Sequence, residues 1–176
     1  MDTQLSETYK KKLIKYFLLC ILSEGSKIIL YSLFFIRINL FIEFLFALFI
    51  LMFLRTNGGG LHFKHYTTCL IFSFLVFLAS VFLGIYVIPN RVVAIFVLII
   101  SIPLGHWCVP ITSNNRPDAS EKLIKKSKRN TLIVLSAYLI SVCILPTNRY
   151  YGIIVWIVII HIVQLLLAKI LKRRST

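Results

Sequence analysis

The chain has 176 residues, of which 59% are hydrophobic, and its mean hydropathy is +0.88. A soluble domain has about 45–50% apolar residues, so this composition excludes an ordinary soluble protein and indicates a single compact helical domain in the membrane. Twenty Lys and Arg against six Asp and Glu give a net charge of +14. These basic residues cluster beside apolar runs, which favours anionic membrane lipids or an acidic peptide as partners, and not nucleic acid.

The four cysteines are scattered along the sequence, at Cys20, Cys69, Cys108 and Cys143. No CxxC pair and no zinc-ligand spacing is present, so we expect neither a disulfide framework nor a bound metal or other cofactor. The first twelve residues are polar, and no cleavable signal peptide is evident.

Residues 1–27 have the pattern of an amphipathic helix that lies on the membrane surface. Lysines at positions 10–12 stand beside Leu13, Phe17 and Leu18 at helical spacing. The polar stretch 23–26 is expected to interrupt this helix. We therefore expect two parts, an N-terminal surface helix over 1–27 and a polytopic membrane domain over 28–176.

Residues 28–54 are apolar except for Arg37, Asn39 and Glu43. One helix of this length would be about 40 Å long, more than a membrane crossing requires, yet the segment is too short for two full crossings. Arg37 and Glu43 must pair, face protein or lie near an interface. Two interpretations stay open, a single tilted helix and a helix broken near residues 37–39.

The remaining apolar runs predict four membrane helices. They cover Leu70–Ile88, Val92–Val109 with Pro103 inside it, Thr131–Leu145 and Tyr150–Leu171. Residues 110–130 between them are expected to form a polar, basic loop. The predicted fold is an all-α integral membrane protein, a helical bundle of about four to six membrane helices with the amphipathic helix at its N-terminus.

The distribution of basic residues predicts the topology. The segment 110–130 and the C-terminus are rich in Lys and Arg and are expected on the cytoplasmic side, whereas the short turns at Arg91 and Arg149 are expected outside. Counting back across two helices places the segment 55–69 on the cytoplasmic side. A cytoplasmic N-terminus then requires an even number of crossings before Arg55, which favours a broken helical hairpin over 28–54.

The segment 55–69 is a polar island between two apolar runs and is the candidate active site. It contains Arg55, the triplet Gly58-Gly59-Gly60, His62, His65 and Cys69. A cysteine acts as a nucleophile through its thiolate, which needs a neighbouring base or positive field. If Thr67 or Thr68 caps the following helix, Cys69 falls in the first turn, where the helix dipole favours negative charge.

Either histidine of the island is a candidate base. His65 and Cys69 would be neighbours at i and i+4 of a continuous helix. His62 would lie about 10 Å from Cys69 along the axis, so their pairing requires a bend in the chain. The glycine triplet allows such a bend. The consecutive glycine amides would form either an anion-binding nest or only a flexible loop.

The pattern Arg55-x6-His62-x6-Cys69 at the start of an apolar run resembles the accessory gene regulator protein B (AgrB) family. These are membrane cysteine endopeptidases of Gram-positive quorum sensing. The resemblance extends to the amphipathic N-terminus and to a Pro-polar-Pro basic segment, here 110–117 followed by Lys125-Lys126-Ser127-Lys128-Arg129. It departs at Thr56-Asn57-Gly58, where relatives often carry further basic or histidine residues.

The resemblance implies that His62 and Cys69 are the catalytic pair and that His65 is a bystander. Cys69 would cleave an AgrD-type propeptide through an acyl-enzyme thioester, and a Cys or Ser of the peptide would close a thiolactone or lactone ring. Arg55 and the glycines Gly58, Gly59 and Gly60 would bind substrate or support the site. The active site would face the cytoplasm of a Gram-positive bacterium, and a homodimer would be consistent with the family.

Two other functions remain as alternatives, a peptide exporter and a non-enzymatic membrane scaffold. An exporter requires polar groups along a path near the membrane midplane, and beyond His161 and Gln164 there are few. These two residues are one turn apart and are expected to hydrogen-bond to another helix. For His106 and Cys108, packing near the interface is the expected role.

Overall fold

The computed structural model describes residues 22–59, 65–109 and 120–174, and throughout these ranges the regular secondary structure is helical, without strands. This confirms the predicted all-α class. The chain divides into two compact units, Met1–Phe41 and Ile42–Thr176, and each is described by itself. Most of the expected surface helix over 1–27 lies outside the described residues, so that helix and its boundary stay predictions.

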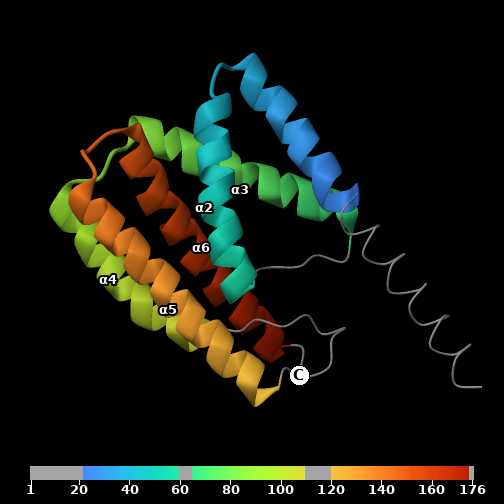
Figure 1. The fold of residues 1–176 in the computed structure, drawn as a ribbon. Helices are drawn as coiled ribbons and strands as arrows, with labels where there is room; N and C mark the ends of the chain where they lie inside the picture. The colour runs from blue at the N-terminus through green and yellow to red at the C-terminus, as the bar shows by residue number, and fades with distance from the viewer. Residues whose placement is uncertain (1–21, 60–64, 110–119, 175–176) are drawn as a thin grey trace, which may run out of the picture. The chain divides into compact units, whose positions relative to one another are not determined.

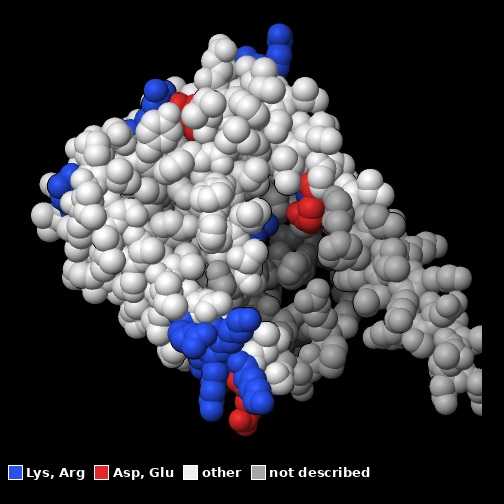
Figure 2. All heavy atoms as spheres, in the orientation of Figure 1, with Lys and Arg blue, Asp and Glu red and all other residues white. Residues whose placement is uncertain are grey.

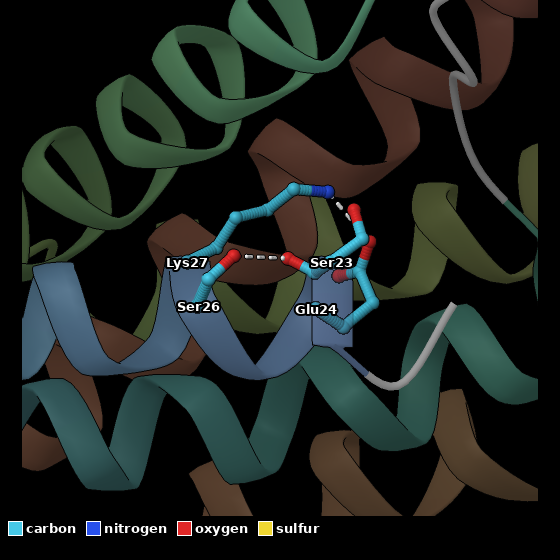
Figure 3. Close-up of polar contacts among 4 residues, drawn as sticks. All are labelled: Ser23, Glu24, Ser26 and Lys27. Carbon is cyan, nitrogen blue, oxygen red and sulfur yellow. Dashed lines mark hydrogen bonds and ion pairs between the residues drawn. The ribbon is translucent and has the colours of Figure 1, made fainter. Parts of the chain in front are cut away.

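A helix covers residues 22–37 of the first unit. The polar stretch 23–26 does not interrupt it, contrary to the sequence-based expectation, because these side chains bond within the helix. The Ser26 hydroxyl donates to the Ser23 carbonyl at 3.0 Å, and Lys27 Nζ lies 2.6 Å from Glu24 Oε1 (Figure 3). Such short-range pairs are compatible with a continuous helix.

This helix ends at a left-handed residue, Asn39, whose φ is 56°. The Leu40 amide donates to the Phe35 carbonyl at 2.9 Å and the Asn39 amide to Ile36 at 3.1 Å. This is the hydrogen-bond pattern of a Schellman helix end, and asparagine tolerates the left-handed conformation better than most residues. The helix over 28–54 is therefore broken near residues 37–39. This confirms one of the two interpretations and excludes a single tilted helix. Its packing as a hairpin stays a prediction.

Five further helices follow: α2 (Phe41–Gly58), α3 (Tyr66–Tyr86), α4 (Arg91–Cys108), α5 (Glu121–Ile144) and α6 (Arg149–Arg174). Among the described residues, three helices are long and apolar enough to cross a membrane: α3, α4 and Arg149–Leu171 of α6. The predicted membrane helix Thr131–Leu145 lies in α5, which is not among these three. In Figure 1, α4 and α5 run side by side, and α6 contacts α3, α4 and α5. Helix α6 supplies the largest share of the core, including Tyr151, Ile153, Ile157 and Leu165.

The expected loop over 110–130 is wrong in its second part, because helix α5 begins at Glu121. The hydroxyl of its N-cap residue Ser120 accepts a hydrogen bond from the Leu123 amide at 3.4 Å. A serine N-cap followed by an acidic first turn starts a helix efficiently, so the basic run 122–129 is helical and continuous with the apolar segment after it. Several of these basic residues are exposed, and they form a dense cluster in Figure 2.

Three polar contacts bring the start of α2 and two interhelical turns to one end of the second unit. Arg91 Nη2 donates to the Leu145 carbonyl at 2.7 Å, and Trp156 Nε1 donates to the Val87 carbonyl at 2.7 Å. Arg149 Nη1 lies 2.7 Å from Glu43 Oε1. Glu43 is therefore paired at the end of a helix, which is one of the ways expected for a charge in this apolar segment.

The C-terminal ends of α2 and α4 and the basic start of α5 lie at the other end of the second unit from these contacts. Arg55, at the end of α2, and the basic start of α5 are therefore on the same side of the unit. This arrangement agrees with the predicted alternation of sides. The orientation in the membrane stays a prediction.

Candidate functional site

Cys69 lies at the end of the first turn of α3 and is half-buried. The N-cap residue of α3 is His65, with φ −99° and ψ 134°, and its side chain makes no capping hydrogen bond. The expected caps Thr67 and Thr68 are wrong, because the extended backbone at His65 starts the helix earlier. The Cys69 amide donates to the His65 carbonyl at 3.2 Å and closes the first turn.

This position suits a nucleophilic sulfur. The first amides of an α-helix point away from the helix and have no carbonyl within it to bond. Together with the helix dipole they favour negative charge near the N-terminus, and the thiolate is the reactive form of cysteine. Cys69 therefore lies in the first turn of α3, as the sequence predicted.

The expected base His62 and the third glycine Gly60 lie outside the described residues. The pairing of His62 with Cys69 therefore stays a prediction. His65, the other candidate base, is exposed and is the N-cap residue itself. It precedes the first helical residue, so the i, i+4 geometry of a continuous helix does not apply to His65 and Cys69.

Arg55, Gly58 and Gly59 lie at the C-terminal end of α2. Gly59 has φ 78°, which favours glycine, and its amide donates to the Arg55 carbonyl at 2.9 Å. Gly58 is still helical and buried. A Cβ on Gly58 would lie 3.3 Å from His161 Nε2 and 3.4 Å from Val109 Cγ2. Gly58 is thus a packing position against α6 and against the end of α4.

His161 and Gln164 of α6 are the residues whose place the sequence did not predict. Their exposed fractions are 1% and 2%. Within the described part of the chain, no hydrogen-bond partner exists for either ring nitrogen of His161 or for either amide atom of Gln164. The expected hydrogen bond to another helix is therefore not found. In the sequence, the only indication of this buried polar pair was the presence of two polar residues in an otherwise apolar run.

The end of α4 is anchored to α6 by Lys169. The ammonium group of Lys169 donates to the Trp107 carbonyl at 2.5 Å and lies 3.4 Å from the centroid of the Trp107 ring. Cys108 is buried beside it, whereas His106 is exposed. These contacts fit the interfacial packing that was expected for this segment.

The apolar helices and the cysteine at the start of one of them define a helical membrane protein with a candidate thiol site at a helix end. Comparison with known proteins identifies the family. The sequence profile of the family described as Accessory gene regulator B matches residues 1–165, and the chain belongs to this family, which acts in the processing of quorum-sensing peptides. An AgrB-like protein of Clostridium perfringens (strain SM101 / Type A) is 25% identical over 150 residues, covering 81% of this chain and 70% of that protein. No solved structure matches the chain.

Proposed function

We propose that this protein is a membrane-embedded cysteine endopeptidase that cleaves an AgrD-type propeptide and cyclises it. Its nucleophile is Cys69 and its base is His62, with Arg55 and the glycine triplet supporting the site. The reaction takes place at the cytoplasmic face of the cell membrane of a Gram-positive bacterium. The position of Cys69 at the N-terminus of α3 is the observation that supports this proposal most directly.

The chemistry proceeds in two transfers of one acyl group. His62 takes the proton of the Cys69 thiol, and the thiolate attacks the carbonyl carbon of the scissile peptide bond. The C–N bond breaks, the leaving amine receives the proton from the imidazolium, and a thioester remains on Cys69. A thiol or hydroxyl within the peptide then attacks the thioester, the bond to Cys69 breaks, and the ring closes as Cys69 regains a proton.

The basic start of α5 supports the proposed location. Lys122, Lys125, Lys126 and Arg129 are exposed on this helix at spacings of three and four residues, so they share one face. Such a face attracts anionic lipid headgroups and marks the cytoplasmic side. It also complements an acidic segment of a propeptide that approaches the site.

The test is co-expression with the propeptide of the same operon, with peptide products detected by mass spectrometry. Cys69→Ala should abolish both cleavage and cyclisation, whereas Cys143→Ala, which removes an exposed cysteine of α5, should leave both unchanged. Denatured wild-type protein should carry a peptide adduct on Cys69 that hydroxylamine releases. Full processing by Cys69→Ala would exclude the enzyme and leave the exporter or the scaffold.

The same assay identifies the base. His62→Ala should abolish cleavage and His65→Ala should retain it, because His65 is exposed at the helix cap. The opposite result, with processing lost only in His65→Ala, would assign the proton transfer to His65.

A further inference from the structure

Helix α6 contains a buried polar pair, His161 and Gln164, that the proposed reaction does not use. Their four polar side-chain atoms make no hydrogen bond within the described part of the chain. Buried polar groups without partners are destabilising, and more so among apolar helices. Leucine at either position would give a better packed helix, so packing alone does not account for these residues.

His161 of this pair lies against the end of α2, which precedes the candidate active-site segment. His161 Nε2 is the atom nearest to a Cβ built on Gly58, at 3.3 Å, and Leu165 on the next turn of α6 lies 3.8 Å from the same point. Arg55 lies one turn before Gly58 on the same helix. The left-handed Gly59 then turns the chain out of α2 toward the segment that contains His62.

We propose that His161 and Gln164 are positioning residues of the peptidase, and that they seat the glycine end of α2 through hydrogen bonds to its main-chain groups when the site engages a peptide. This inference rests on the proposed function, because the proposed base His62 follows the end of α2 in the sequence. Glycine at position 58 lets the main chain approach the imidazole edge closely. The Nε2 atom of His161 then lies beside the last turn of α2, where helix carbonyls lack partners within the helix, and Gln164 is on the next turn of α6.

The test compares stability with turnover in purified protein reconstituted in nanodiscs with the synthetic propeptide. His161→Leu and Gln164→Leu remove the polar atoms and keep similar volumes. Each should leave the unfolding midpoint unchanged or raised, lower kcat by about tenfold or more and change KM by less than about twofold, since displaced catalytic groups reduce the rate strongly. His161→Gln should recover most of kcat. Ile157→Leu, an apolar exchange at a buried position of the same helix, should change neither quantity.

Two results would overturn the inference. Wild-type kcat in both leucine variants would show that the pair plays no part in catalysis. A loss of unfolding temperature that parallels the loss of kcat in both variants, without recovery in His161→Gln, would show a structural role only. Both results require a wild-type activity that depends on Cys69. Failure of the proposed function is a different result, because the Cys69→Ala variant would then remain active.

Discussion

A Cβ atom added to Gly152 would overlap the carbonyl oxygen of Gly84, so the main chains of α6 and α3 touch at their crossing. From the other side, a Cβ on Gly84 would lie 2.6 Å from the Ile153 amide nitrogen. Small residues permit such close approach between membrane helices. This crossing fixes the helix that begins beside Cys69 against the central helix α6.

Gly152→Ala should therefore destabilise the protein by about 2 kcal/mol, within the range for overpacked positions, because the contact is with main chain that cannot rotate away. Thermal unfolding in detergent measures the change. Gly25→Ala is the matched control, since a Cβ there meets nothing within 4 Å, and alanine favours the helix over glycine. Equal midpoints for Gly152→Ala and wild type would contradict the close crossing.

The ion pair between Glu43 and Arg149 should be asymmetric in its response to mutation. The Glu43 side chain is 5% exposed and that of Arg149 is 54% exposed. Arg149→Met leaves a buried carboxylate without its partner and should destabilise by about 1–2 kcal/mol, less than for a fully buried pair because water screens the arginine. Glu43→Gln should have a smaller effect.

The double variant Glu43→Gln/Arg149→Met tests the coupling, because it removes both charges together. Its unfolding midpoint should exceed that of Arg149→Met alone. The cycle compares the wild type, the two single variants and the double variant. Strictly additive losses of stability would show that the two side chains do not stabilise the protein through their mutual interaction.

Lys169 should hold α4 to α6 through its contacts with Trp107. Lys169→Met loses both the hydrogen bond to the carbonyl and the cation–π contact and should destabilise by about 1–2 kcal/mol, while Lys169→Arg retains the charge and most of the stability. Tryptophan emission and the unfolding midpoint report the change. Lys126→Met removes the same charge from an exposed position of α5 and should leave both unaltered; an equal response would attribute the effect to net charge.

The sidedness of the unit is tested with cysteines introduced at its two ends in a cysteine-free background. Thr147→Cys lies in the turn between α5 and α6, and Lys126→Cys lies on the basic part of α5; both positions are exposed. A membrane-impermeant maleimide added to intact cells should label only Thr147→Cys, and permeabilised cells should show both. Labelling of Lys126→Cys in intact cells would reverse the proposed orientation.

Some local features of the chain were predicted correctly because their causes lie within a few residues. The length of the apolar runs indicated membrane helices, and Gly59 and Asn39 mark chain reversals whose conformations those residues favour. The start of α5 was missed although its signal was present. Ser120 followed by Glu121 is a helix start, but the high charge of the next eight residues favoured a loop.

By itself, the sequence determined that this is an all-helical membrane protein and that Cys69 stands at the start of one of its helices. Only the tertiary structure decided which helix faces meet: Gly84 against Gly152, and Gly58 against His161. The reason is that lipid and protein interior are both apolar, so the sequence of a membrane helix does not mark the face that packs. The place of His161 beside the polar island depends on a contact between residues that are far apart in the chain, and no local pattern encodes it.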